Sequence, residues 1–197
     1  MDRQPHWSYL GLQGGARIEA VPDPRFGSVL KSTVADSGPT RAHMAKEFDP
    51  PFDIGNRCSV KLPVWLSKDY QPGSGGWASF ISVFSKTEWH GGDFDILAMI
   101  DMGSNGMPYI AVREQHTGEL LTMYRGRTRL LPERWYTLDL RIEGNTLHLL
   151  IDNTEEAFGP KNDKVDNRIT MIHGGAYGDK LPPGSYILNG PFQVNCW

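Results

Sequence analysis

The sequence lacks most of the features that would place it outside ordinary globular proteins. It has no apolar run near the ~20 residues of a membrane-spanning helix, and its opening segment, MDRQPHWSYLGLQGG, has no apolar stretch of signal-peptide length. We therefore expect a soluble, unprocessed product without a membrane span. The net charge is −3, from 20 Lys and Arg against 23 Asp and Glu. Without a basic excess, nucleic acid is not predicted as a partner.

Cysteine is scarce as well. The chain contains two, Cys58 in the apolar segment RCSVKLPVWL and Cys196 next to the last residue. Two cysteines make no disulfide framework, and a free cysteine commonly behaves as a small core residue. We predict two buried free thiols. The alternative is a disulfide that ties down the C-terminus if the protein works outside the cytosol.

Helical periodicity is also missing, because no stretch of about fifteen residues repeats apolar side chains at helical spacing. Instead, 22 Gly and 14 Pro interrupt short apolar runs. About twelve short strands, with turn signals every ~8–12 residues, are typical of a sandwich or barrel. No linker divides the chain, so residues 1–197 are predicted to form a single all-β domain. The polar segment 155–167 is expected to be a long surface loop.

The clearest local pattern lies between Leu131 and Asn153. Two alternating segments flank the dipeptide Gly144-Asn145, a frequent two-residue hairpin turn. Alternation places one set of side chains on the buried face of this hairpin, namely Tyr136, Leu138, Leu140, Leu147, Leu149 and Ile151. We predict that these side chains form part of the core.

This hairpin resembles a recurrent phrase of the concanavalin A-like jelly rolls, which include laminin-G-like domains and polysaccharide lyases. The shared elements are a Trp, an alternating strand, a Gly-Asn or Asp-Gly turn and a strand that ends in Asp. Two further segments, VLKSTV followed by RAHMA and then VKLPVWLSKDY, resemble the lyase branch in order and wording. The resemblance implies a two-sheet antiparallel β-sandwich of the jelly-roll type that handles sugars.

The resemblance also shows where this chain departs from the lyases. An acidic residue commonly stands two positions after the strand Arg, and here that position is His43. The expected Gln position is occupied by Val83 or Ser85, and Gly178 follows Tyr177 where a partner Gln is expected. Eliminative cleavage of a uronic acid needs a group that neutralises the carboxylate, a base and an acid. The residues that would supply these roles are Arg41, His43, Arg113 and Tyr177.

Aromatic side chains beside hydrogen-bonding groups are candidates for sugar binding, because a sugar face packs favourably on an aromatic ring. The loop Glu88-Trp89-His90-Gly91-Gly92 has this character, although Trp89 packed on the base of a surface hairpin is the alternative. The predicted ligand-binding residues are Trp89, His90, Tyr109, Arg113 and Tyr177. The predicted core includes Trp65 and Trp135.

Metal sites and hydrolase chemistry have weaker signals. The six histidines lack zinc-ligand spacing, and no cofactor is predicted. Calcium is the remaining metal, through the loop carboxylates Asp152, Asp163 and Asp166. The pair Asp93 and Asp95 only imitates the paired carboxylates of glycoside hydrolases, and a solvated start of a strand is the preferred interpretation.

Because half of the lyase set is absent, we predict a non-catalytic carbohydrate-binding or surface-attachment module with a glycan or polysaccharide as partner. Such a module could be a phage virion component, of the decoration or tail type, with neighbouring virion subunits as partners and a virion or extracellular location. No cleavage of alginate, glucuronan or heparin-like polymers is then expected. The first alternative is a polysaccharide lyase acting on an acidic polysaccharide, and the second is a purely structural assembly subunit.

Overall fold

The computed structural model describes residues 8–13, 15–35, 40–88, 93–114 and 117–197. Every regular element in this part of the chain is a β-strand, and none of its segments is a helix that could span a membrane. The strands are β1 (Tyr9–Gln13), β2 (Arg17–Asp23), β3 (Gly27–Thr33), β4 (Thr40–Asp53), β5 (Arg57–Leu66), β6 (Trp77–Glu88), β7 (Asp93–Gly103), β8 (Pro108–Arg113), β9 (Leu120–Arg125), β10 (Trp135–Glu143), β11 (Thr146–Ile151), β12 (Thr154–Pro160), β13 (Arg168–Asp179), β14 (Tyr186–Asn189) and β15 (Gln193–Cys196).

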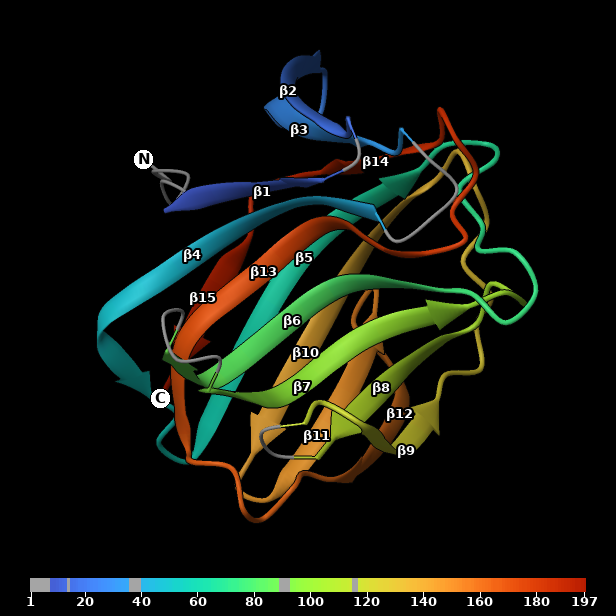
Figure 1. Ribbon diagram of the computed structural model, residues 1–197. Coiled ribbons are helices and arrows are strands. Elements are labelled where there is room, and N and C mark those ends of the chain that lie inside the picture. Colours follow the sequence, from blue (N-terminus) through green and yellow to red (C-terminus); the bar gives the residue numbers. More distant parts are fainter. Residues whose placement is uncertain (1–7, 14, 36–39, 89–92, 115–116) are drawn as a thin grey trace.

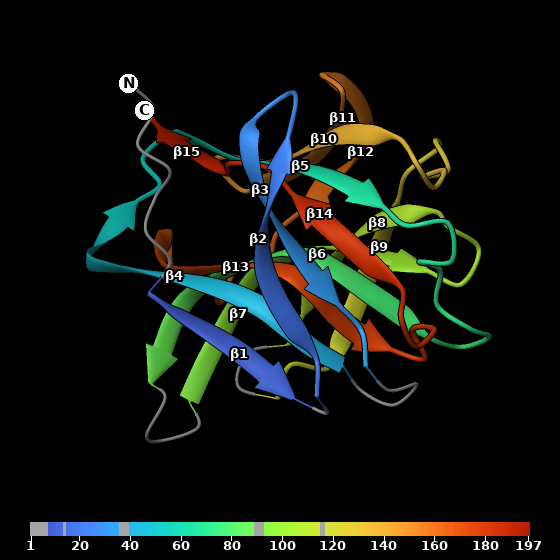
Figure 2. The same ribbon diagram turned by 90° about the horizontal axis from the view of Figure 1, so that it is seen from above.

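The strands form two antiparallel sheets that pack as two layers (Figure 1). Sheet A has the order β1-β4-β13-β6-β7-β8-β9. Sheet B has the order β12-β11-β10-β5-β14-β3-β2, with β15 also paired to β5. The β2–β3 hairpin extends beyond the edge of the sandwich (Figures 1 and 2). The fold is an all-β, two-sheet antiparallel sandwich of the jelly-roll type, as predicted.

The hairpin predicted from the sequence is confirmed, with β10 and β11 turning at Gly144 and Asn145. Gly144 has a φ of +57°, which the tight turn requires and glycine adopts without steric cost. In the register, Leu140 lies opposite Leu149, and both side chains are fully buried. The other predicted inward residues, Tyr136, Leu138, Leu147 and Ile151, are buried as well.

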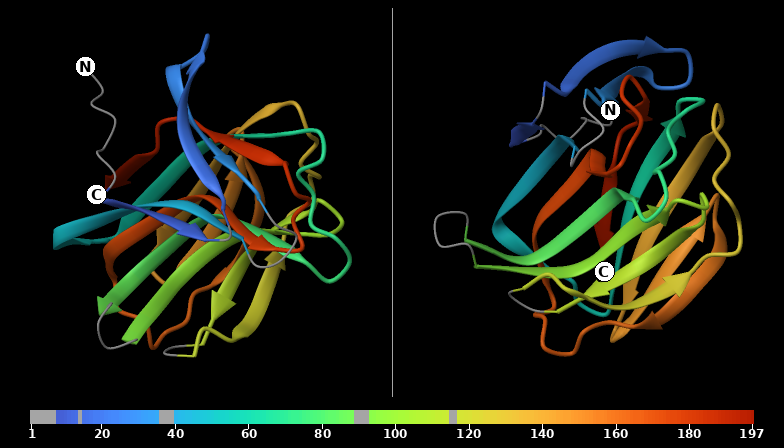
Figure 3. Two further views of the ribbon diagram at one scale, coloured as in Figure 1. Left: turned by 45° about the horizontal axis from the view of Figure 1, so that its top comes forward. Right: turned by 45° about the vertical axis from the view of Figure 1, so that its right-hand side comes forward.

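The main core lies between the sheets and is built from the inward face of each strand. On β7, which has neighbours on both sides, Leu97, Ala98 and Ile100 are buried in this core, while Ile96 and Met99 belong to a second apolar cluster. That second cluster lies on the other face of sheet A, pointing away from sheet B. Figure 3 shows the two layers from two further directions. Sheet A therefore carries apolar side chains on both faces, which accounts for the apolar character of β7.

The segment predicted as a long loop from residue 155 begins instead as strand β12, so this prediction is wrong. The apolar–polar alternation of a strand is not visible in the sequence here, because the charged Glu156 occupies a buried position. The carboxylate accepts hydrogen bonds from the backbone N–H groups of Arg127 and Thr128, both at 2.8 Å, and from the Thr128 hydroxyl at 2.7 Å. These bonds compensate its burial and hold the residues after β9 against β12.

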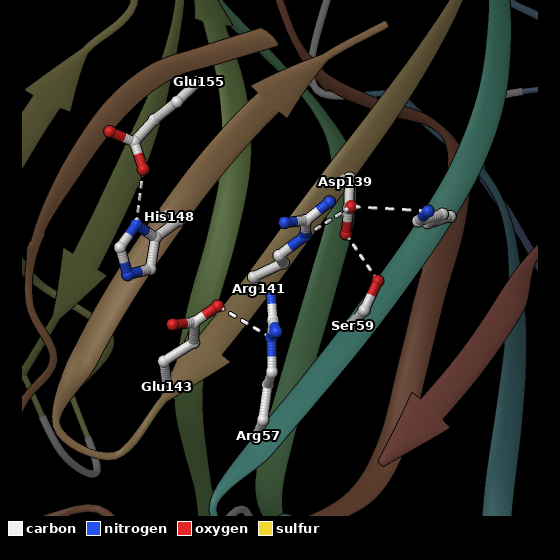
Figure 4. A network of polar contacts seen from close by, with 8 residues as sticks. Arg57, Ser59, Asp139, Arg141, Glu143, His148 and Glu155 are labelled. Carbon is white, nitrogen blue, oxygen red and sulfur yellow. Dashed lines mark hydrogen bonds and ion pairs between the residues drawn. The ribbon is translucent and has the colours of Figure 1, made fainter. Parts of the chain in front are cut away.

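A buried carboxylate also organises the outer face of sheet B (Figure 4). Asp139 accepts a hydrogen bond from the Ser59 hydroxyl at 2.6 Å and from Arg141 Nε at 2.9 Å, and Lys61 Nζ lies 3.7 Å away. Arg57 on β5 forms an ion pair with Glu143 on β10, and His148 Nδ1 on β11 lies 2.7 Å from a carboxylate oxygen of Glu155 on β12. The polar side chains of this face bind one another and link β5, β10, β11 and β12.

Trp65 and Trp135 were predicted as core residues, and this prediction is wrong. They lie opposite each other in the register of β5 and β10, next to the buried Val64 and Tyr136. Because side chains alternate along a strand, both indoles point to the outer face of sheet B and are half-buried there. The indole of Trp135 packs against the ring of Phe26, with centroids 5.0 Å apart.

The two cysteines form a disulfide, so the prediction of free thiols is wrong. Cys58 on β5 lies directly opposite Cys196 on β15. The bridge joins two residues that are 138 positions apart in the sequence. Next to the bridge, the backbone N–H groups of Arg57 and Trp197 each donate a hydrogen bond to the carbonyl oxygen of the other residue. The C-terminal strand is thus covalently attached to the centre of sheet B.

We expect removal of this bridge to lower the free energy of unfolding by ~2–5 kcal/mol, because the unfolded chain regains the freedom of a very long loop. Urea unfolding should be measured with and without reductant, and for the double variant Cys58→Ser/Cys196→Ser. Reductant should lower the wild-type midpoint and leave that of the variant unchanged. Equal wild-type midpoints in both conditions would contradict the bridge.

Candidate active site on the outer face of sheet A

Six strands of sheet A each contribute one residue to a continuous row on the face that points away from sheet B. Successive register pairs connect Arg41, Tyr177, Ser79, Asp101, Tyr109 and Arg125, in the order from β4 to β9. Arg41 and Arg125 are separated by five strand spacings, about 24 Å at ~4.8 Å per strand. A polar row with an arginine at each end thus crosses six of the seven strands of sheet A, all except β1.

A parallel row lies next to the first and is mostly apolar. It consists of Ala45, His173, Ser82, Met99, Ala111 and Met123. The Ser79 and Ser82 hydroxyls are 3.2 Å apart and connect the rows. The face therefore presents the exposed cations Arg41 and Arg125 and the half-buried Tyr177 along one line, and mostly apolar side chains along the next. This combination suits sugars, which have both polar edges and apolar faces.

Two histidines stack on this face beside the polar row. The rings of His43 on β4 and His173 on β13 have centroids 4.4 Å apart, and the Tyr177 ring meets His43 edge-on at 5.8 Å. Glycine makes this packing feasible. A Cβ atom at Gly11 would overlap the His43 imidazole, and one at Gly175, where φ is +111°, would lie 2.6 Å from the Ala42 carbonyl oxygen.

Both histidines are held in the neutral form at ordinary pH. Burial lowers the pKa of His43 to about 4, and the positive charge of Arg41 adds to this effect. Burial lowers the pKa of His173 to about 3, with further contributions from His43 and Arg41. A neutral imidazole can accept a proton, so the pair provides proton acceptors next to a cation and a phenol.

These shifts predict how stability depends on pH. A histidine in the unfolded chain has a pKa of ~6.5. Between pH 6.5 and the pKa values of about 4 and 3 in the folded protein, the unfolded chain therefore binds more protons than the folded protein does. The contribution of His43 and His173 to stability is therefore complete above pH 6.5 and is lost as the pH falls toward 4 and 3. Urea midpoints should fall on acidification, and less so in the double variant His43→Gln/His173→Gln. Parallel pH curves for both proteins would contradict this prediction.

Arg113 is fixed by three contacts of its guanidinium group. It donates to Met99 Sδ at 3.0 Å, to the Gly118 carbonyl at 3.0 Å and to Asp101 Oδ2 at 3.3 Å. Asp101 is fully buried, and this burial raises its pKa to about 6 although Arg113 and a hydrogen bond from Ser79 lower it. Arg113 therefore serves mainly to neutralise a buried carboxylate.

The indole of Trp77 connects Arg113 to the histidine side of the face. Its ring meets Tyr177 edge-on at 5.2 Å, and the Arg113 guanidinium carbon lies 5.9 Å from its centroid. On the other side of Tyr177, the guanidinium carbon of the exposed Arg41 lies 5.7 Å from the phenol ring. With its side chain exposed, Arg41 is more available to an external anion than Arg113.

The structure brings together the four residues that the lyase alternative requires. Arg41, His43, Arg113 and Tyr177 share one face and are connected through ring contacts. Of the predicted ligand-binding residues, Tyr109 lies in the polar row but is largely buried, and burial raises its pKa to about 12. Trp89 and His90 lie outside the described residues.

Sequence reasoning missed His173, Trp77 and Asp101. A signal for His173 existed, because it lies four residues before Tyr177 and even spacing on a strand predicts a shared face. The two positions expected to correspond to the lyase Gln do not face the site. Val83 belongs to the core between the sheets, and Ser85 is fully buried. The residues of β6 that face the site include Trp77, Ser79, Ser82 and Phe84.

Two of the three proposed calcium ligands have other partners. Asp152 accepts a hydrogen bond from the Thr137 backbone at 2.8 Å, and Asp166 pairs with Arg168 at 2.9 Å. Within the described ranges, no three His, Cys, Asp or Glu side chains are grouped so that they could hold a metal ion. Calcium binding by Asp152, Asp163 and Asp166 thus gains no geometric basis here.

The sequence matches no family model and no curated protein. Solved structures do match its fold. Glucuronan lyase from the fungus Trichoderma reesei aligns with a TM-score of 0.71 at 14% identity, over 97% of this chain and 91% of that one. Alginate lyase vAL-1 from a Chlorella virus gives 0.64 at 10% identity, over 92% and 90%. Alginate lyase AlyC3 gives 0.62 at 12% identity, over 89% and 77%.

The chain shares the jelly-roll fold of these polysaccharide lyases. This finding corrects the main functional prediction, a non-catalytic carbohydrate-binding or surface-attachment module, which is wrong; the match favours the lyase alternative. The comparisons give no support to a virion component or to virion partners. At 10 to 14% identity the likeness shows the fold alone, so an activity must be argued from the site.

Proposed function

We propose that the protein is a polysaccharide lyase that cleaves an acidic polysaccharide by β-elimination on the outer face of sheet A. The observation that carries this proposal is the clustering of an exposed arginine, a neutral imidazole and a phenol. Arg41 and His43, both on β4, lie beside the Tyr177 ring, with the Arg41 guanidinium carbon 5.7 Å and the His43 ring centroid 5.8 Å from its centroid. Variants of alginate lyase A1-II', which has the same fold, have been solved in complex with product and with substrate, which supports a glycan partner.

Arg41 is the group that binds the carboxylate of a uronic acid. Its guanidinium neutralises the negative charge that spreads onto the carboxylate when the neighbouring carbon loses its proton. Arg125, at the far end of the polar row, gives a second cationic contact for a more distant uronate. Since Arg113 is paired with Asp101, the accessible charge of the row is positive, as an anionic polymer requires.

His43 accepts the C5 proton and Tyr177 donates a proton to the departing oxygen. The electrons of the broken C5–H bond form the C4=C5 double bond, the C4–O bond breaks, and its oxygen leaves as a hydroxyl. The bound carboxylate offsets the positive charge of Arg41, which raises the pKa of His43 and makes it a better base in the complex. The imidazolium and phenolate then return to their starting forms by proton exchange.

The test is incubation of the purified protein with glucuronan, alginate and a heparin-like polymer, with a neutral glucan as control. Elimination creates unsaturated uronic ends, so ultraviolet absorbance should rise steadily with at least one acidic polymer. Arg41→Ala should abolish the rise. The matched control is Arg168→Ala, which removes an exposed arginine that pairs with Asp166 and should cleave normally. Equal rates for the two variants would contradict the assigned role.

The pH profile tests the base. If neutral His43 accepts the proton, kcat/KM should stay high as the pH falls through 6.5 and decline only near its pKa of about 4. An ordinary histidine would lose activity near pH ~6.5. A decline centred there, in protein that remains folded by circular dichroism, would exclude His43 as the base.

A further inference from the structure

Trp77 lies beside the proposed catalytic residues but has no part in the elimination described above. It is half-buried at the start of β6, and its indole meets the Tyr177 ring edge-on at 5.2 Å on the outer face of sheet A. The Arg113 guanidinium carbon lies 5.9 Å from the indole centroid, near the outer limit of ~6 Å for a cation–π contact. Arg113 therefore does not cover the ring closely, and a partly exposed indole stands next to the proposed acid.

The neighbours of Trp77 in the sheet leave space beside this indole. On β7 its register partner is Gly103, where the nearest described atom to an added Cβ would be Asn105 Oδ1, at 3.4 Å. On β13 its partner is the half-buried Asp179. Asp179 lies two residues after Tyr177, so its side chain is on the same face. An aromatic surface with an open position on one side and a carboxylate on the other has the composition of a sugar subsite.

The strand order fixes the side of Tyr177 on which Trp77 lies. Strand β13 lies between β4 and β6 (Figure 1), so Tyr177 lies between Arg41 and Trp77. In the proposed reaction, Arg41 holds the carboxylate of the uronate and Tyr177 protonates the oxygen on C4. The sugar attached to this oxygen therefore continues past Tyr177, away from Arg41, and reaches the indole.

We propose that Trp77 is the stacking platform for the sugar that departs in the elimination, an inference that rests on the proposed function. The apolar face of this sugar packs on the indole, and its hydroxyls donate hydrogen bonds to the Asp179 carboxylate. The departing sugar lies on the non-reducing side of the broken bond. The polymer therefore runs with its non-reducing end toward β9, where Arg125 contacts a uronate of the departing segment.

Steady-state kinetics of polymer cleavage tests the role of the indole. Trp77→Leu removes the aromatic face but keeps an apolar side chain, so KM should rise about tenfold. The value of kcat should change little, because the contact holds substrate and transition state alike. Trp77→Phe keeps an aromatic ring and should recover most of the affinity. The matched control is Trp65→Leu, at a half-buried indole that stacks on Tyr186 in sheet B, and it should behave as wild type.

A pair of synthetic substrates locates the contact. Each contains one uronate of the polymer that wild type cleaves. Its 4-oxygen carries a further sugar in the first substrate and a methyl group in the second, which therefore releases methanol. Trp77→Leu should lower kcat/KM about tenfold on the first substrate and leave it nearly unchanged on the second. Thermal melts show that each variant is folded.

The inference is overturned if Trp77→Leu affects the two substrates alike, because the indole then makes no contact with the departing sugar. It is also overturned if kcat falls on the polymer at unchanged KM, because Trp77 then acts only by supporting Tyr177. The absence of unsaturated products from wild type is a different result, which refutes the proposed function and this inference with it.

Discussion

Replacing Tyr177 with Phe should reduce the rate of polymer cleavage by about 10²–10⁴-fold, the usual contribution of a positioned acid or base. The substitution removes only the hydroxyl, and the ring contacts with His43, Trp77 and Arg41 remain. The fold should therefore be unaffected. The loss should appear in kcat, with little change in KM, because the phenol acts on the departing oxygen and does not hold the substrate.

The matched control is Tyr186→Phe. Tyr186 is also half-buried and also lies beside a cation, Lys31 at 4.4 Å from its ring centroid, but it belongs to sheet B. This variant should cleave at the wild-type rate. If Tyr177→Phe keeps full activity while His43→Ala loses it, the departing oxygen is protonated by another group and the role given to Tyr177 is wrong.

Replacing Leu140 with Ala should lower the free energy of unfolding by ~2–5 kcal/mol, through lost burial and the cavity that remains. Leu140 is fully buried and lies between Val60 on β5 and Leu149 on β11. As a comparison, Leu131→Ala removes the same atoms from an exposed site and should cost far less. A denaturant midpoint for Leu140→Ala within error of wild type would contradict the register of this hairpin.

The fold was predictable where the pattern is local. Strict alternation and the Gly144-Asn145 turn define the β10–β11 hairpin, and its apolar face is buried as expected. The disulfide depends on a long-range event, the return of β15 to lie beside β5. No local pattern near Cys58 or Cys196 encodes the order of strands in a sheet. Strand β12 was missed because Glu156 is a charged residue on a buried position, held by loop N–H groups far away in sequence.

The site was predictable in part for the same reason. Alternation along β4 places Arg41 and His43 on one face, and the structure agrees. The ion pair between Asp101 and Arg113 could not be predicted from the sequence. It depends on β7 and β8 being neighbours in the sheet and on the length of the arginine side chain. His173 was overlooked because the six histidines were weighed only for zinc-ligand spacing. In the structure Gly174 and Gly175, which follow it, continue β13, and Gly175 allows the strand to approach His43 closely.

The central claim is β-elimination on an acidic polysaccharide, and mass spectrometry of the products tests it most directly. Oligosaccharides should be released whose new non-reducing ends are unsaturated uronates, each lighter by one water than the corresponding hydrolysis product. They should be absent when Arg41→Ala or Tyr177→Phe replaces wild type. Products of full hydrolytic mass, or no products from glucuronan, alginate or a heparin-like polymer, would contradict the lyase assignment.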